Sequence, residues 1–435
     1  MDNIKIPNNT SIKEEVLMKG KILATLLCAS MALGMMGCGS GNGDGSTQKG
    51  SSSDKTVTLL SWYQEEKMSD IKAGFEKANP GYELEVQYVP PTEQYIQKLT
   101  LLMNGNEPTD LFFMCPEVRE DVEATDFAED LSDLPIMNKL SDSAKRTLGI
   151  NGKVYGLSLD SWASFIFYNK EVFDKAGIKE TPTTWDELVD DMAKIKEIGV
   201  EPMTAQSEDA GRLCLGLFAS NEASKDPEVE AGLADGSKKF SDLYKESMDA
   251  WYDDVVKPGY LGQSCLSLTN DQQEEMFING QAGMMIGGPW TLPDFESKNP
   301  DAEYGTFAIP GFNGETMLQG SANVGIGITK DGKNKEGAQK FMDYLCSDEG
   351  IQCWSDTFGN FMNVSGFDYT VDPCLEGFKE DVSEGKIYWQ TVEWPSSSSI
   401  LNAYTAACQN VIAGVSTPKE ALESVDEKFD EILNK

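Results

Sequence analysis

Carboxylates are the reactive side chains that this sequence offers in number. Asp and Glu together make up 72 of the 435 residues, whereas histidine is absent. The absence of histidine excludes Ser-His and Cys-His nucleophile pairs and every histidine-ligated metal site. Hydrolysis of a glycosidic bond by two carboxylates remains open. With so many acids, however, two carboxylates can lie close together by chance, so their number does not favour an enzyme.

The nine cysteines show no metal or redox motif, because no two of them are spaced as C-x-x-C. No D-x-D-x-D-G loop for calcium occurs either, so we expect neither a metal nor another cofactor. Cys346 and Cys353 are seven residues apart in a helical pattern, which predicts one shared, buried face. Two cysteines, Cys28 and Cys38, lie in the N-terminal segment. We expect the other seven to be free and buried: Cys115, Cys214, Cys265, Cys346, Cys353, Cys374 and Cys408.

The net charge of −36 narrows the range of partners. The acids are spread along the chain rather than gathered in one tail. A surface of this kind repels phosphate backbones and anionic headgroups. We therefore expect no nucleic-acid partner.

The N-terminal segment has the features of a secretory signal. A basic head, MKGK at residues 18–21, precedes the apolar run 22–36, which is short for a bilayer-spanning helix. Gly37-Cys38 resembles the lipobox of bacterial lipoproteins, in which cleavage leaves a lipidated cysteine first. The Gly/Ser-rich residues 39–53 then suit a flexible tether. We expect residues 1–37 to be an upstream extension and a signal peptide, with Met18 as the true start, and residues 38–53 to be the lipidated Cys38 and its linker.

Strand and helix patterns alternate between residues 57 and 114. Residues 57–62 and 110–114 read as buried strands, and residues 82–89 alternate as in a half-exposed strand. Residues 67–81 and 92–105 carry apolar side chains at helical spacing. This order, with short connections, predicts a parallel, doubly wound sheet.

The pattern continues beyond residue 150. Residues 152–160 and 163–169 predict two paired strands, and residues 181–199 predict a helix with a capping box from Thr184 to Glu187. Residues 220–280 read as mostly helical and polar. Further strands are predicted at 282–288, 304–310 and 324–329, and one helix at 334–356 with Phe341, Leu345 and Cys346 facing inward. Trp185, Trp251 and Trp354 lie on helical stripes and are assigned to cores or surfaces.

Four stretches together resemble a known family. They are SWYQEEKMSDIKAGFEKANPGYELEV (61–86), NGKVYGLSLDSWASFIFYNKEVFDKAGI with TPTTWDEL (151–188), FINGQAGMMIGGPW (277–290) and VGIGITKDGKNKEGAQKFMDYLCSDEG (324–350). They resemble the extracellular solute-binding proteins of carbohydrate ABC transporters, the maltose-binding-protein-like family. Members in Gram-positive bacteria are commonly tethered by a lipid, which agrees with the lipobox.

The resemblance implies an α/β fold of two lobes, each a mostly parallel sheet flanked by helices, joined by three chain crossings. Matching stretches place residues 54–160 and 322–362 in the first lobe, and residues 161–318 and 363–435 in the second. The ligand would lie in the cleft between the lobes, which close on it like a hinged clamp.

Sugars are uncharged and have apolar C–H faces, so their sites need aromatic rings and short polar side chains. Trp290 matches a sugar-stacking tryptophan of the family, with packing in a core as the alternative. Trp62, Glu65 and Glu66 lie where the first strand ends, the side on which parallel sheets bind ligands, although Glu66 can also be a solvated charge. Glu117 follows the strand DLFFM, with a surface acid as its alternative. The remaining candidates are Asp160 and Trp162 at the first crossing, Asp209, Arg212, Asn360 and Trp394.

The resemblance therefore implies a monomeric, lipid-anchored binding protein on the extracytoplasmic face of the cell membrane. It would capture a sugar or an oligosaccharide and deliver it to ABC transporter permease subunits, without catalysis. Two alternatives remain open. The same architecture can bind another small solute, such as a polyol or a peptide, and an exported glycoside hydrolase would also use carboxylates.

Overall fold

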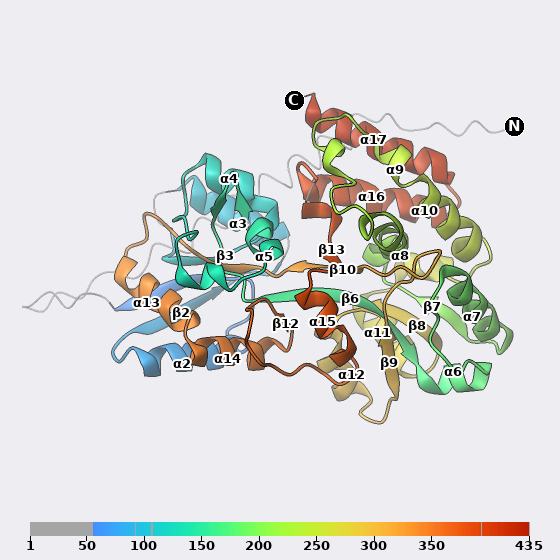
Figure 1. The fold of residues 1–435 in the computed structure, drawn as a ribbon, viewed down its shortest axis with the longest axis horizontal. Helices are drawn as coiled ribbons and strands as arrows, with labels where there is room; N and C mark the ends of the chain where they lie inside the picture. The colour runs from blue at the N-terminus through green and yellow to red at the C-terminus, as the bar shows by residue number, and fades with distance from the viewer. Residues whose placement is uncertain (1–54, 92, 106–107, 393, 435) are drawn as a thin grey trace, which may run out of the picture. The chain divides into compact units, whose positions relative to one another are not determined.

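Two large sheets organise the part of the chain described by the computed structural model, residues 55–91, 93–105, 108–392 and 394–434 (Figure 1). The first sheet has the order β11-β3-β1-β2. β1 (Thr56–Ser61) is parallel to β2 (Glu83–Tyr88) and to β3 (Leu111–Met114), whereas β11 (Gly325–Ile328) is antiparallel to β3. The predicted parallel sheet of residues 57–114 is confirmed.

The second sheet has the order β13-β10-β6-β8-β7, and two further strands pair with β6. β6 is antiparallel to all four of its partners, so this sheet is mixed. The expectation of a mostly parallel sheet is wrong for this lobe, because four later segments of the chain all pair with the long strand β6 in the antiparallel direction. The strands are β6 (Asp160–Asn169), β7 (Glu201–Thr204), β8 (Ala282–Gly287), β9 (Tyr304–Phe307), β10 (Leu318–Ala322), β12 (Phe361–Met362) and β13 (Ile387–Tyr388).

Helices flank both sheets. Those associated with the first are α2 (Ser69–Ala78), α3 (Glu93–Met103), α4 (Arg119–Ala124), α5 (Asp142–Thr147), α13 (Lys335–Leu345) and α14 (Asp348–Phe358). Those associated with the second are α6 (Lys170–Ala176), α7 (Trp185–Glu197), α8 (Arg212–Phe218), α9 (Phe240–Leu243), α10 (Lys245–Ala250), α11 (Asn270–Ile278), α12 (Leu292–Lys298), α15 (Lys379–Ser383), α16 (Ser397–Ile412) and α17 (Pro418–Leu433).

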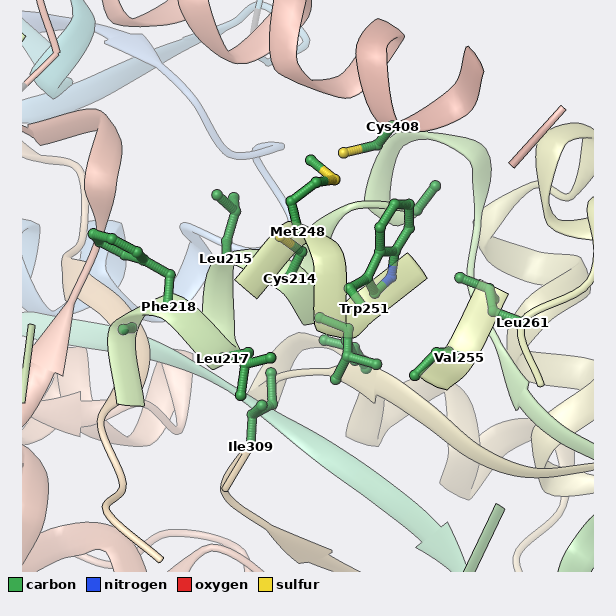
Figure 2. Close-up of a cluster of buried hydrophobic side chains, with 14 of the residues drawn as sticks. Cys214, Leu215, Leu217, Phe218, Met248, Trp251, Val255, Leu261, Ile309 and Cys408 are labelled. Atoms are coloured by element: carbon green, nitrogen blue, oxygen red, sulfur yellow. The ribbon is translucent and has the colours of Figure 1, made fainter. Parts of the chain in front are cut away.

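Each sheet has its own apolar core, which confirms the two-lobed α/β fold. The first core takes its buried residues from 57–159 and 322–364, and the second from 166–429. Figure 2 shows part of the second core. Cys214 and Leu215 of α8 gather there with Met248 of α10, with Trp251, which directly follows α10, and with Cys408 of α16. The described residues nevertheless belong to one compact unit. We refer to the two halves as the first lobe and the second lobe.

Three local predictions need correction. Residues 152–160 and 163–169 do not pair with each other, because 160–169 belong to the single strand β6 while β5 (Lys153–Val154) pairs with β4 (Gly149–Ile150). The helix predicted over 334–356 is two helices, because Ser347 caps α14 by accepting a hydrogen bond from the amide of Gly350. Cys346 follows α13 and is only half-buried.

The capping box at α7 forms only in part. Thr184 Oγ1 accepts a hydrogen bond from the Glu187 amide, but the Glu187 carboxylate accepts from Thr183 rather than from Thr184. Trp185, Trp251 and Trp354, for which the sequence leaves core and surface positions open, are fully buried in the cores. All seven described cysteines are free, as expected, but Cys346, Cys353 and Cys374 are partly exposed. No helix in the described ranges combines the length and the apolar character needed to cross a membrane.

Candidate functional site

A cavity of about 1060 Å³ lies between the two lobes and is lined by residues of both. From the first lobe come Trp62, which directly follows β1, and Pro116 and Glu117, which follow β3. The second lobe supplies the larger wall, including Trp162 of β6 and Arg212 of α8. The carboxyl ends of parallel strands meet at one edge of a sheet, so the first sheet brings its contributors together.

Three tryptophans form an aromatic cluster on the second-lobe wall. The ring of Trp162 contacts Trp389 at 5.0 Å and Trp290 at 6.0 Å between centroids, both edge to face. The side chain of Trp290 is 48% exposed, so it does not pack inside a core. Its ring lies close to the chain at Gly288, where a Cβ would come within 2.2 Å of Trp290 Cζ3, so any other residue at this position would displace the ring. The result is a set of flat aromatic faces on the second-lobe wall of the cavity.

Arg212 is fixed against this aromatic cluster by its own charge partner. The Arg212 guanidinium donates to Asp209 Oδ1 at 2.8 Å and to Ser164 Oγ at 3.2 Å. It also lies 5.3 Å from the ring centroid of Trp389. Gln206 Nε2 donates to Asp209 Oδ2 at 2.8 Å. The wall therefore carries an ordered ion pair rather than an unpaired cation.

Glu117 supplies a carboxylate to the first-lobe wall. Its Oε2 atom is buried and has no hydrogen-bond partner among the described residues. Desolvation raises the pKa of Glu117, although the Cys115 thiol and the Arg119 charge act in the opposite direction. A buried carboxylate oxygen with no partner can accept a hydrogen bond from a ligand hydroxyl or amine.

Asp160 lies behind the cavity, where the chain passes between the lobes. Its Oδ2 accepts from Asn360 Nδ2 at 2.5 Å and from Asn323 Nδ2 at 3.1 Å, and its Oδ1 accepts from Trp354 Nε1 at 2.8 Å. Asp160 begins β6, Asn323 follows β10, and Asn360 precedes β12, so all three crossings meet at one carboxylate. Burial raises the pKa of Asp160, while the hydrogen bonds from Trp354, Asn360 and Asn323 lower it.

The cavity brings together six of the predicted site residues: Trp62, Glu117, Trp162, Asp209, Arg212 and Trp290. The other five do not line it. Glu65 and Glu66 are exposed, and Asp160 and Asn360 are buried at the crossings. Trp394 is in the second core, where its Nε1 donates to Glu230 at 2.9 Å.

Sequence reasoning missed Trp389, Gln206 and Asn323, which line the cavity. Trp389 directly follows the two-residue strand β13, and a tryptophan at a strand end was the signal that could have identified it. Within the described ranges there is no cluster of three or more His, Cys, Asp or Glu side chains placed to hold a metal ion.

Comparison with known proteins identifies the family. The family model described as "Bacterial extracellular solute-binding protein" matches residues 59–352, more than half of the chain. The chain belongs to this family.

The relatives of this solute-binding protein agree in length as well as in sequence. It is 24% identical to the "Multiple sugar-binding protein" of Streptococcus mutans, over 82% of this chain and 87% of that protein. It is 27% identical to the "Diacetylchitobiose binding protein DasA" of Streptomyces coelicolor, over 76% and 79%. A solved family 1 extracellular solute-binding protein from Bifidobacterium longum subsp. infantis matches with a TM-score of 0.74 and 27% identity, over 86% of this chain and 99% of that one. The family and these relatives are binding proteins.

The substitution Asp160→Asn tests the role of the carboxylate at the crossings. One amide oxygen cannot replace two carboxylate oxygens that accept three side-chain donors, and the new NH₂ group would face a donor. We expect the free energy of unfolding to fall by roughly 1–3 kcal/mol, measured by urea denaturation. Asp254→Asn is the matched control, because Asp254 accepts one tryptophan Nε1, from Trp185, and a single oxygen suffices. Equal stability of Asp160→Asn and wild type would contradict this role.

The substitution Glu117→Gln tests the cost of the buried carboxylate. A group whose pKa is raised in the folded state stabilises the fold at low pH and loses that contribution as the pH rises through the raised value. We therefore expect Glu117→Gln to unfold with a higher free energy than wild type at pH 7, and the difference to shrink as the pH falls toward the ordinary value of 4.5. Urea denaturation at several pH values measures this. A constant difference between Glu117→Gln and wild type over this pH range would refute the cause assigned here.

Proposed function

We propose that this solute-binding protein is a lipid-anchored receptor that captures a sugar or an oligosaccharide outside the cell and delivers it to ABC transporter permease subunits. The observation that carries the proposal is the aromatic cluster of Trp162, Trp290 and Trp389 on one wall of the cavity, opposite Trp62. Flat indole faces are complementary to the C–H faces of a pyranose ring.

The charges in the cavity also favour an uncharged ligand. Arg212 is paired with Asp209, and the remaining charged lining residues, Glu117 and Glu208, are acids. Binding an anionic solute there would bring like charges together in a partly desolvated space. Two relatives named for saccharides also support a saccharide ligand. A multiple sugar-binding protein and a diacetylchitobiose-binding protein each match most of this chain.

The two lobes and the crossings between them suit a protein that closes on a ligand rather than one that catalyses a reaction. We propose the boundaries expected from the sequence, with 54–160 and 322–362 in the first lobe and 161–318 and 363–435 in the second. A monomer suffices, because both walls of the cavity come from one chain. The signal segment and Cys38 lie outside the described residues, so the anchor rests on the sequence alone.

A thermal-shift screen identifies the ligand class. The panel contains maltotriose, cellotriose, raffinose, a trimer of galacturonic acid, sorbitol and a tripeptide. A ligand at 100 times its dissociation constant stabilises the fold by about 2.7 kcal/mol, which a raised Tm reports. We expect a neutral saccharide to raise Tm most, and Trp290→Ala to weaken its binding by roughly ten-fold or more.

Tyr88→Ala is the matched control for Trp290→Ala, because Tyr88 is an exposed aromatic residue on β2 that does not line the cavity. The largest shift with sorbitol or the tripeptide would assign a different solute. Cleavage products in the same mixtures would identify a hydrolase instead. Unchanged affinity in Trp290→Ala would place Trp290 outside the ligand site.

The lipid anchor has a separate test. Cys38→Ser removes the thiol that the proposed lipobox offers for lipidation, while the linker is kept. We expect the wild-type protein in the membrane fraction of a Gram-positive host and the variant in the culture medium. Cys28→Ser is the matched control and should stay with the membrane. Retention of both variants in the membrane would contradict the assignment of Cys38.

A further inference from the structure

Gln319 of β10 has an unusual environment for an amide. Its side chain is 1% exposed, and neither Oε1 nor Nε2 has a hydrogen-bond partner among the described residues. Buried polar groups are paired in most proteins, because an unpaired donor or acceptor keeps its full desolvation cost. An apolar side chain of similar size would avoid that cost, so packing alone does not account for Gln319.

The strand register places Gln319 beside the cavity. On β10 and β6, Ser321 is opposite Trp162, and both of these residues line the cavity. Gln319 is opposite Ser164 one step further along the same face, since side chains two residues apart on a strand point to the same side. Ser164 Oγ accepts a hydrogen bond from the cavity-lining Arg212, which confirms that this face continues the wall.

A second buried amide lies in the neighbouring segment. Gln390 follows Trp389 and precedes Thr391, both of which line the cavity. Gln390 is fully buried and its Nε2 donates to the Leu215 carbonyl at 2.9 Å, but its Oε1 has no partner in the described part of the chain. The next strand over from β10 is β13, which ends just before Trp389.

These residues form a layer between the cavity and the second core. On this face of β6, Trp162 lines the cavity, Ser164 comes next, and Ile166 lies in the second core. Along β10 the same face runs from Ser321, through Gln319, to the core residue Met317. We call Ser164, Gln319 and Gln390 the polar layer. It contains one amide donor and two amide acceptors that no described residue satisfies.

We propose that Gln319 is a ligand-binding residue that determines specificity, and that it pairs in the polar layer with a hydroxyl group of a neutral saccharide. This inference rests on the proposed function. A hydroxyl both donates and accepts, so it can satisfy amide Nε2 and Oε1 groups together. A carboxylate or phosphate offers acceptors alone and would leave Gln319 Oε1 and Gln390 Oε1 facing a negative charge. Arg212 does not offset this, since Asp209 already pairs with it.

A ligand group must pass beside Arg212 and Trp389 to reach the polar layer from the cavity. These two side chains line the cavity and contact each other. The hydrogen bond from Arg212 to Ser164 Oγ, at 3.2 Å, is longer than the one from Arg212 to Asp209, at 2.8 Å. A ligand hydroxyl can replace the serine oxygen as the acceptor for this guanidinium while Asp209 keeps the guanidinium in place. The aromatic cluster would then hold the ring, and the polar layer would select the group that projects from it.

The substitution Gln319→Met tests the proposal with two readouts. Methionine is similar in length and carries no amide, so we expect the free protein to melt at a higher Tm, because two unpaired buried atoms are removed. We expect roughly ten-fold weaker binding of the best neutral saccharide among maltotriose, cellotriose and raffinose, measured by calorimetry. The Tm readout needs no ligand. We also expect wild type to bind the galacturonic acid trimer more weakly than that saccharide.

Thr329→Val is the matched control. Thr329 is 1% exposed in the first lobe, its Oγ1 also has no partner among the described residues, and it does not line the cavity. This variant should raise Tm in the same direction without changing the affinity.

The outcomes separate the two claims. Unchanged saccharide affinity in Gln319→Met, together with binding by wild type, would overturn the role of Gln319 and leave the proposed function intact. A lower Tm in the free variant would show that the amide serves the fold, for example through an ordered water, and would also overturn the role. Preference of wild type for the galacturonic acid trimer would overturn the hydroxyl assignment. Failure of wild type to bind any saccharide would overturn the proposed function, and this inference with it.

Discussion

One buried carboxylate connects the two halves of this protein. Asp160 accepts hydrogen bonds from side chains at the second and third crossings while it belongs to the first. Its backbone carbonyl also accepts from the Asn323 amide and from Asn363 Nδ2. Because these donors are neutral, the carboxylate is stabilised by geometry and hydrogen bonding rather than by a counter-ion. This small network joins the three chain segments that pass between the lobes.

The two walls of the cavity differ in chemistry because the first sheet contributes the segments that follow its strands, whereas the second sheet contributes one of its faces. The first lobe contributes the short segments that follow β1 and β3, and through them Trp62 and Glu117. The second lobe contributes the face of a mixed sheet, where β6 and β10 run from the crossings into the core. Strands that continue into a core bring polar residues such as Ser164 and Gln319 directly beneath the cavity.

Binding and stability make opposite demands on several of these side chains. Glu117 Oε2 and the Gln319 amide are buried without partners among the described residues, and we expect each to cost the free protein stability. The cores contain stacked rings, such as Phe240 and Tyr244 at 4.0 Å between centroids, and also some unpaired buried atoms, such as Trp251 Nε1 and Thr329 Oγ1. What distinguishes Glu117 and Gln319 is their position at or beside the cavity, where a ligand can supply the missing contacts.

The sequence by itself determined the local elements of the first lobe and the helix cap at Thr184, and the resemblance of four stretches to a known family implied the two-lobed fold. The local elements depend on periodicity and on motifs that are contiguous in the chain. Only the tertiary structure decided that β6 is a single antiparallel strand, that Trp389 faces the cavity while Trp394, five residues later, is buried with Glu230, and that Asp160 joins the crossings. Each of these depends on partners far away in the chain, such as Asn360 for Asp160, and a sequence pattern contains no information on which distant segments meet.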